Sequence, residues 1–183
     1  MSKISSLYVF LLFLIVIFFF NFTIYADQTN TIEAVIGSDQ TVFHWLSYDQ
    51  AITKSKVENI PTLIYFYSDQ CGWCRKLENE TLDDEKVKAI MVKNFSTVKI
   101  NSNSSKTVIE NGKKITEKQL SEQVYQVKGT PTIWFLTSDN KRIASLPGYV
   151  KPDMLINVLN YIKDGSYKKV TFQEYMEQKN NQS

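Results

Sequence analysis

The chain contains two cysteines, Cys71 and Cys74, and both lie in the segment SDQCGWCRKLENE. This spacing allows three kinds of chemistry: a structural disulfide, half of a metal site, or a redox pair that exchanges disulfides with other molecules. A disulfide between residues so close in sequence closes a very short loop. The entropy that a disulfide removes from the unfolded chain grows with loop length, so a structural role would stabilise the fold little.

The metal alternative lacks ligands. A tetrahedral zinc site takes about four ligands, and beyond the two cysteines the chain has a single histidine, His44. We therefore expect no metal and no cofactor apart from the redox-active disulfide. A copper-delivery or haem-maturation module with the dithiol as its ligand is an alternative function. A redox-inert chaperone, in which Cys71 would be dispensable, is another.

The residues around the pair favour redox chemistry. IPTLIYFYS (60–68) is apolar on both faces and predicts a central strand covered on both sides, and a helical pattern resumes after Cys74. A cysteine at the start of a helix meets unpaired N–H groups and partial positive charge, which stabilise its thiolate. We expect Cys71 to attack a substrate disulfide and Cys74 to resolve the resulting mixed disulfide.

A second motif, GTPT at 129–132, contributes a substrate-binding prediction. X-Pro bonds can be cis at modest cost, and proline has no backbone N–H to donate. Beside a dithiol, Pro131 would leave the backbone around Thr130 free to pair with an extended substrate segment. We expect Trp73, between the two cysteines, to be exposed and to contact substrate; packing on the rim of the site is the alternative.

The elements that must position these residues follow from periodicity and turn signals. The order predicts an α/β fold in which a central mixed β-sheet is flanked by helices on both faces. Helices are expected at 43–59, after Cys74 with a break near 81–83, at 116–127, at 151–165 and from 171. Strands are expected at 60–68, at 96–101, as a hairpin within 107–116, and as two strands within 129–149.

The first 26 residues resemble a signal peptide: Lys3, an apolar run from Leu7 to Phe20, and a small residue, Ala26, at the cleavage position. The run is short for a transmembrane helix, which needs about 20 residues, but an uncleaved anchor is the alternative. Either predicts export, where disulfides persist. The expected division is 1–26 signal, 27–41 linker, 42–165 catalytic domain and 166–183 C-terminal extension.

The net charge of +2 and the lack of a basic stripe give no reason to expect a nucleic-acid partner.

The chain resembles the thioredoxin superfamily in three motifs, which occur in the same order: YFYSDQCGWC, VKIN and YQVKGTPTIWF. KLENETLDDEKVKAIM is similar to exported bacterial members. These include the SoxW-like periplasmic thioredoxins and the C-terminal domain of the transmembrane thiol–disulfide interchange reductase.

This resemblance implies a thioredoxin fold with Cys71 nucleophilic, Cys74 resolving and Pro131 cis. It implies a periplasmic or membrane-anchored oxidoreductase that acts on disulfides or thiols of protein substrates and takes electrons from a membrane-bound donor.

Supporting roles are expected for Gly72, Tyr65 and Lys99, of which Lys99 matches the lysine of the family. Tyr65 occupies the position of the buried acid of the family, so the proton-handling role of that acid is expected to pass to Asp69, Lys99 or water, or to be absent. The stretch 101–115 is longer than in a minimal thioredoxin and is expected to influence the choice of partner.

Overall fold

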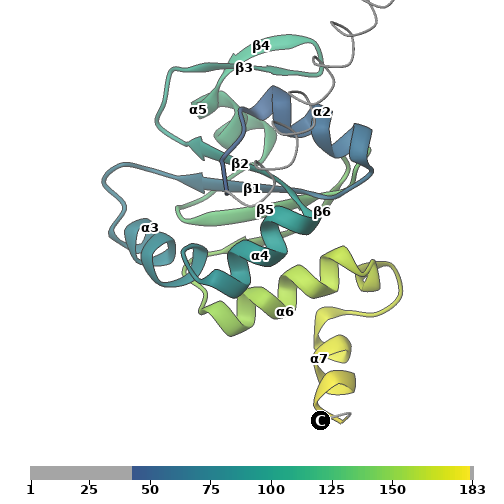
Figure 1. Ribbon diagram of the computed structural model, residues 1–183. Helices are drawn as coiled ribbons and strands as arrows, with labels where there is room; N and C mark the ends of the chain where they lie inside the picture. The colour runs from purple at the N-terminus through teal and green to yellow at the C-terminus, as the bar shows by residue number, and fades with distance from the viewer. Residues whose placement is uncertain (1–42, 182–183) are drawn as a thin grey trace, which may run out of the picture. The chain divides into compact units, whose positions relative to one another are not determined.

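A four-stranded mixed sheet forms the centre of the computed structural model, which describes residues 43–181 (Figure 1). Its strands are β1 (Thr62–Tyr67), β2 (Ser96–Asn101), β5 (Thr132–Leu136) and β6 (Arg142–Pro147). They lie in the order β2-β1-β5-β6. Strand β1 runs parallel to β2 and antiparallel to β5, which is antiparallel to β6.

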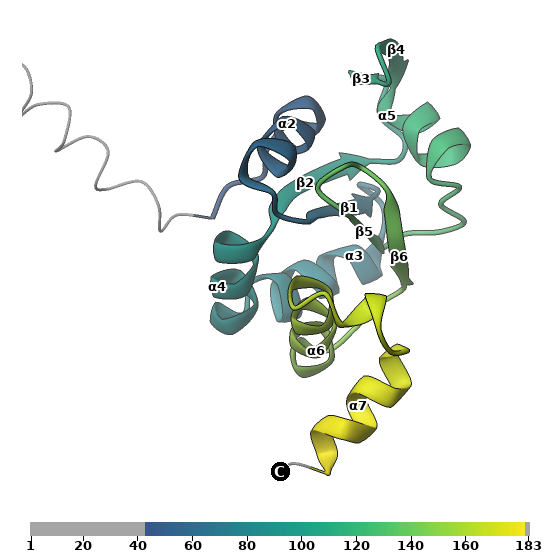
Figure 2. The ribbon, with the colours of Figure 1, turned by 90° about the vertical axis from the view of Figure 1, so that its right-hand side faces the viewer.

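Helices cover both faces of this sheet (Figures 1 and 2). The helical elements are α2 (Tyr48–Glu58), α3 (Gly72–Leu77), η1 (Glu78–Leu82), α4 (Glu85–Asn94), α5 (Glu117–Gln119), η2 (Leu120–Val124), α6 (Pro152–Lys163), η3 (Ser166–Lys168) and α7 (Phe172–Asn180). α2, α5 and η2 lie on one face, and α3, α4 and α6 lie on the other. The predicted α/β fold, a mixed sheet between two helical layers, is confirmed.

Strand β1 is buried on both faces, as the apolar run at 60–68 predicts. Successive side chains of a strand point to opposite faces. Leu63 and Tyr65 pack into the core under α3, α4 and α6, whereas Ile64 and Phe66 pack into the core under α2 and η2. All four side chains are fully buried. The C-terminal end of β1, where the cysteine segment begins, is therefore held from both sides.

The helix after the cysteines is interrupted, as its sequence predicts. Helix α3 has Cys71 as its N-cap and continues into η1, a π-helical turn that ends at Leu82. Asp84 then begins α4, because its carboxylate accepts hydrogen bonds from the backbone N–H groups of Lys86 and Val87 at 2.9 and 3.1 Å. The dithiol helix is thus a short element of its own.

Three other helices begin at capping boxes, in which a hydroxyl and an acidic or amide side chain each bond to the backbone. Ser47 caps α2, Thr116 caps α5 and Thr171 caps α7. The predicted helix at 116–127 is shorter than expected: α5 passes directly into the π-helical η2, which ends at Val124.

The predicted hairpin is present as β3 (Thr107–Glu110) and β4 (Lys113–Thr116), which form a separate two-stranded sheet. Its turn residues, Asn111 and Gly112, have positive φ angles of 50° and 75°, which suits the Asn-Gly pair. The hairpin lies on α2, where Asp49 accepts a hydrogen bond from the backbone N–H of Ile109 at 2.9 Å.

A buried tyrosine pair anchors the hairpin to the core. The Tyr48 hydroxyl donates to the Glu110 carboxylate at 2.6 Å and lies 3.0 Å from the Tyr125 hydroxyl. Burial raises the pKa of Tyr125 to about 12, and burial also raises the pKa of Tyr48. Both hydroxyls therefore stay protonated at neutral pH, and Tyr48 can donate its hydrogen bond to Glu110.

Residues 1–42 lie outside the described part of the chain, and with them the predicted signal peptide and linker. Among residues 43–181, no helix has the length and apolar character to cross a membrane.

The buried tyrosines predict a loss of stability at alkaline pH. An unfolded tyrosine has a pKa of about 10, so as the pH rises the unfolded state releases its proton before folded Tyr125 does. This stabilisation is complete below about pH 10 and is lost as the pH rises through the folded-state pKa of about 12. Urea denaturation measures this loss. As the pH rises from about 9 to about 12, we expect the titration of Tyr125 to reduce the free energy of unfolding by about 2 kcal/mol.

The Tyr125→Phe variant removes this titrating group and keeps the other tyrosines as an internal background. We expect its free energy of unfolding to fall less steeply over the same pH range. An equal fall in both proteins would contradict the assignment.

Candidate functional site

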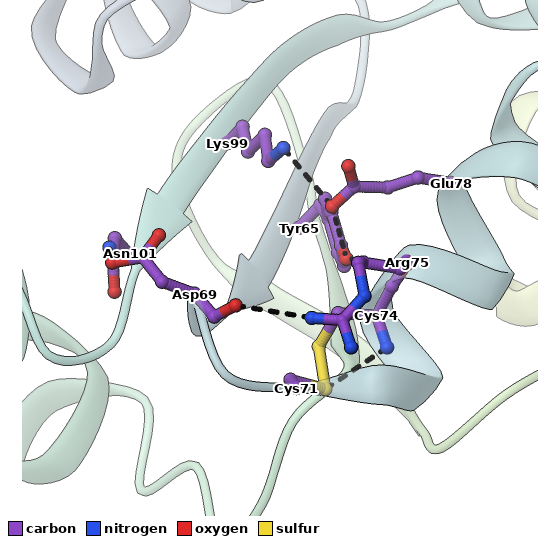
Figure 3. Close-up of polar contacts among 8 residues, drawn as sticks. All are labelled: Tyr65, Asp69, Cys71, Cys74, Arg75, Glu78, Lys99 and Asn101. Carbon is purple, nitrogen blue, oxygen red and sulfur yellow. Dashed lines mark hydrogen bonds and ion pairs between the residues drawn. A yellow bond between two sulfur atoms is a disulfide. The ribbon is translucent and has the colours of Figure 1, made fainter.

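Cys71 and Cys74 lie at the start of α3, directly after the end of β1 (Figure 3). They form a disulfide with an S–S distance of 2.11 Å and a Cα–Cα distance of 5.2 Å. The structure therefore brings together the two residues that the sequence singles out, at the junction of strand and helix that redox chemistry requires.

The two sulfurs have different surroundings. Cys74 is 1% exposed and belongs to the core under α3, α4 and α6, whereas Cys71 is partly exposed at the helix N-terminus. The backbone N–H of Cys74 donates to Cys71 Sγ at 3.0 Å. In the dithiol form, the same N–H and the helix dipole can stabilise a thiolate at Cys71. An incoming disulfide can therefore reach Cys71 and not Cys74.

The loop before β5 brings Thr130 and Pro131 next to Cys71. The Thr130–Pro131 peptide bond is cis. The carbonyl oxygen of Thr130 lies 3.3 Å from Cys71 Sγ, and the hydroxyls of Thr130 and Ser68 are 3.2 Å apart. The Pro131 carbonyl accepts a hydrogen bond from the N–H of Gly148 at 2.8 Å, which ties this loop to the end of β6.

On the core side of the dithiol, the side chain of Tyr65 is fully buried in the same cluster as Cys74 and Leu77. Its hydroxyl donates to Glu78 Oε1 at 2.9 Å and lies 3.4 Å from the carbonyl oxygen of Cys74 (Figure 3). Burial, reinforced by the bond to Glu78, raises the pKa of Tyr65 well above its usual value. At neutral pH Tyr65 is therefore a neutral hydrogen-bond donor.

Lys99, on the neighbouring strand β2, meets the same carboxylate. Its ammonium group lies 3.1 Å from Glu78 Oε1, 4.1 Å from the centroid of the Tyr67 ring and 5.8 Å from that of the Tyr65 ring. The side chains of Lys99 and Glu78 are 24% and 33% exposed. Lys99 therefore contacts Tyr65 and Glu78 in a charged pair that is partly exposed to solvent.

Sequence reasoning overlooked Glu78 as the carboxylate of the site. Asp69, the acid considered from the sequence, instead accepts a hydrogen bond from the Asn101 amide at 2.8 Å, while its carbonyl oxygen lies 3.4 Å from the Arg75 guanidinium (Figure 3). The available signal was the spacing: Glu78 follows Cys74 by four residues, which places both on one side of a helix.

Trp73 is exposed as expected, with 60% of its surface accessible. Its ring lies 5.9 Å from the ring of Tyr149, and the Lys76 ammonium lies 5.3 and 4.9 Å from the two ring centroids. The Tyr149 hydroxyl donates to Glu80 at 2.7 Å. Trp73, Lys76 and Tyr149 form an exposed aromatic surface at the dithiol helix, here called the Trp73 surface.

Gly72 has no steric requirement to be glycine. A Cβ atom at this position would meet only the Arg75 side chain, at 3.8 Å, an ordinary van der Waals distance. The described residues, 43–181, contain no group of three or more His, Cys, Asp and Glu side chains arranged to hold a metal ion.

Comparison with known proteins finds similar sequences and similar structures. Residues 48–163 match the thioredoxin-like domain family. The chain is 26% identical over 106 residues to the disulfide bond reductase DsbH of Chlamydia pneumoniae. This alignment covers 56% of the chain and 61% of that protein, so the chain spans about three fifths of the length of this relative.

Solved structures show the same fold. A thioredoxin-fold protein from Helicobacter pylori has a TM-score of 0.59 at 25% identity, covering 69% of this chain and 88% of its own. A thioredoxin from Thermus thermophilus has a TM-score of 0.54 at 20% identity, covering 66% and 86%. With a family match that includes the dithiol, Tyr65 and Pro131, the chain belongs to the thioredoxin-like domain family, and its resemblance to the thioredoxin superfamily is confirmed.

Proposed function

We propose that this protein is an exported thiol–disulfide oxidoreductase that reduces or exchanges disulfides in extracytoplasmic proteins. One observation carries the proposal: a disulfide-forming pair in which Cys71 is accessible at a helix N-terminus and Cys74 is buried behind it. In this arrangement a substrate can reach the sulfur of Cys71, while the sulfur of Cys74 is placed to react in the second step.

The proposed reaction has two displacement steps. The Cys71 thiolate attacks one sulfur of a substrate disulfide, so that a mixed disulfide forms and the other substrate sulfur leaves as a thiolate. Cys74 then attacks Cys71 Sγ, which forms the Cys71–Cys74 disulfide and releases the second substrate thiolate. Two electrons pass to the substrate, and a thiol-based reductant must return two electrons to the enzyme for each turnover.

The surroundings of Cys71 support binding of an extended substrate segment. Pro131 has no backbone N–H, and the Thr130 carbonyl lies 3.3 Å from Cys71 Sγ. Backbone groups of the loop are thus close enough to the reactive sulfur to pair with a substrate strand. The Trp73 surface supplies aromatic area on the dithiol helix for side chains that flank the substrate cysteine.

Two features favour the reductive direction. The residues between the cysteines, Gly72 and Trp73, do not include a histidine, which would stabilise a thiolate in a strong oxidant. The relative from Chlamydia pneumoniae is named a disulfide bond reductase. The apolar N-terminal run from Leu7 to Phe20 supports export, and an exported reductase needs electrons from a donor at the membrane.

The difference in burial predicts which sulfur reacts first. When the reduced protein is treated with a limiting amount of iodoacetamide, we expect the label on Cys71, because Cys74 is 1% exposed. Peptide mass spectrometry reads the position of the label. Urea-unfolded protein is the control and should label both cysteines to a similar extent. Preferential labelling of Cys74 in the folded protein would contradict the assignment of Cys71 as the nucleophile.

Insulin reduction tests the activity itself. With dithiothreitol as the electron donor, we expect the protein to accelerate the precipitation of reduced insulin, and Cys71→Ser to lose the acceleration entirely. Cys74→Ala should lose turnover and, once dithiothreitol has been removed, should accumulate a mixed disulfide with substrate, because the attack on substrate precedes resolution.

The Cys74→Ala variant can also be mixed with proteins of the natural source in place of insulin. Partners that it traps as mixed disulfides, identified by mass spectrometry, would name the natural substrates. Stoichiometric binding of Cu(I) by the dithiol without any reduction of insulin would contradict the proposal and favour copper delivery.

A further inference from the structure

We propose that Lys76 gives the Trp73 surface a preference for substrates that carry an aspartate or glutamate next to their reactive cysteine. This inference rests on the proposed function, because it names the class of protein disulfide that the same site would accept. The observation behind it is an exposed ammonium group on the dithiol helix that contacts two aromatic rings.

The Trp73 surface joins the two segments that border the reactive sulfur. Two of its members, Trp73 and Lys76, belong to the dithiol helix α3. The third, Tyr149, follows Gly148, whose backbone N–H donates to the Pro131 carbonyl at 2.8 Å. The surface is thus tied to the cis-proline loop as well as to the helix. The side chains that flank a substrate cysteine therefore have this surface within reach while the mixed disulfide exists.

Two hydrogen bonds hold the segment around Tyr149 in place before any substrate arrives. The Tyr149 hydroxyl donates to Glu80 at 2.7 Å, and the carbonyl of the next residue, Val150, accepts a bond from the buried Thr81 hydroxyl at 2.6 Å. Both partners belong to η1, the π-helical turn that follows α3. The aromatic ring and the ammonium group are therefore positioned by one continuous helical segment, so binding has less conformational entropy to remove.

Lys76 has no acidic partner in the described part of the chain. Glu80 follows it by four residues, a spacing at which opposite charges pair on an α-helix. Here the helix has become π-helical, and the Glu80 carboxylate accepts the Tyr149 hydroxyl instead. The Lys76 ammonium lies 5.3 and 4.9 Å from the ring centroids of Trp73 and Tyr149. The rings orient the cation and leave its charge available to an incoming carboxylate.

The neighbouring charges leave the dithiol helix positive. Helix α3 contains Arg75 and Lys76 and no acidic residue. Arg75 contacts only the carbonyl oxygen of Asp69 among the described polar groups, at 3.4 Å (Figure 3). The first acid of η1, Glu78, is compensated by Lys99 at 3.1 Å. The helix therefore attracts an acidic substrate segment and repels a basic one.

An acidic side chain suits both parts of the surface. Its carboxylate can accept a charge-assisted hydrogen bond from the Lys76 ammonium, which has three donors. Its methylene groups can pack on the Trp73 ring, which is 60% exposed. A glutamine side chain of the same shape offers the packing without the charge, so comparing glutamate with glutamine isolates the contribution of Lys76.

Peptides that carry a pyridyl disulfide test this preference in the reduced full-length protein. When the Cys71 thiolate attacks the peptide sulfur, a mixed disulfide forms and neutral pyridinethione leaves, so its absorbance gives the rate. Three peptides of equal length carry glutamate, glutamine or lysine on both sides of the cysteine. The ratio of the glutamate rate to the glutamine rate measures the preference, because a general change in the reactivity of Cys71 cancels.

We expect the unaltered protein to react about 2- to 5-fold faster with the glutamate peptide than with the glutamine peptide at low salt. The lysine peptide should be the slowest. Lys76→Gln should bring the ratio to about 1, and Lys76→Glu should make the lysine peptide the fastest. About 0.5 M sodium chloride should remove most of the preference of the unaltered protein, because salt screens exposed charges.

Lys56→Gln is the matched control. Lys56 is exposed on α2, which lies on the other face of the sheet from α3, and its loss changes the net charge by the same amount (Figure 2). This variant should keep the ratio of the unaltered protein.

Equal rates with the glutamate and glutamine peptides in the unaltered protein would overturn the inference and leave the proposed function intact. A preference that survives in Lys76→Gln, or that Lys56→Gln loses to the same extent, would also overturn it. Failure of the reduced, unaltered protein to release pyridinethione from any peptide would instead show that Cys71 is not a nucleophile, which would contradict the proposed function as well.

Discussion

Burial of β1 on both faces is the constraint on which the site depends. Leu63 and Tyr65 are held by one helical layer and Ile64 and Phe66 by the other, so the strand cannot slide or rotate without exposing large side chains. Its end therefore delivers Cys71 to the start of α3 in a fixed orientation. The parallel pairing of Tyr65 with Lys99 in the register of β1 and β2 fixes the lysine at the same level.

The burial of β1 also explains why a tyrosine suits position 65. An ionised carboxylate buried at this position would lose its hydration, which is costly unless partners replace it. Tyr65 brings a neutral hydroxyl into the core instead. The negative charge resides on Glu78, one helical turn from Cys74 and partly exposed, where Lys99 compensates it. The Tyr65 hydroxyl thus lies between the backbone of Cys74 and the Glu78 carboxylate, and the charge of Glu78 stays partly exposed.

Much of this could be predicted from the sequence, because it is local. The strand before Cys71, the helix after it, the break before Asp84 and the Asn111-Gly112 turn each follow from a few neighbouring residues. The contribution of Glu78 could not, because it depends on where the Tyr65 hydroxyl points across two packed elements. The packing of the hairpin on α2 could not be predicted either, because Tyr48 and Glu110 lie far apart in sequence.

The direction of electron flow is the central claim, and the reduction potential of the Cys71–Cys74 pair tests it most directly. Equilibration with dithiothreitol or glutathione redox buffers, followed by alkylation and mass spectrometry, gives the fraction reduced at each poise. A reductase or exchange role predicts a potential between about −270 and about −180 mV, the range of thioredoxin and protein disulfide isomerase. A potential near about −120 mV, as in a strong oxidant, would contradict it.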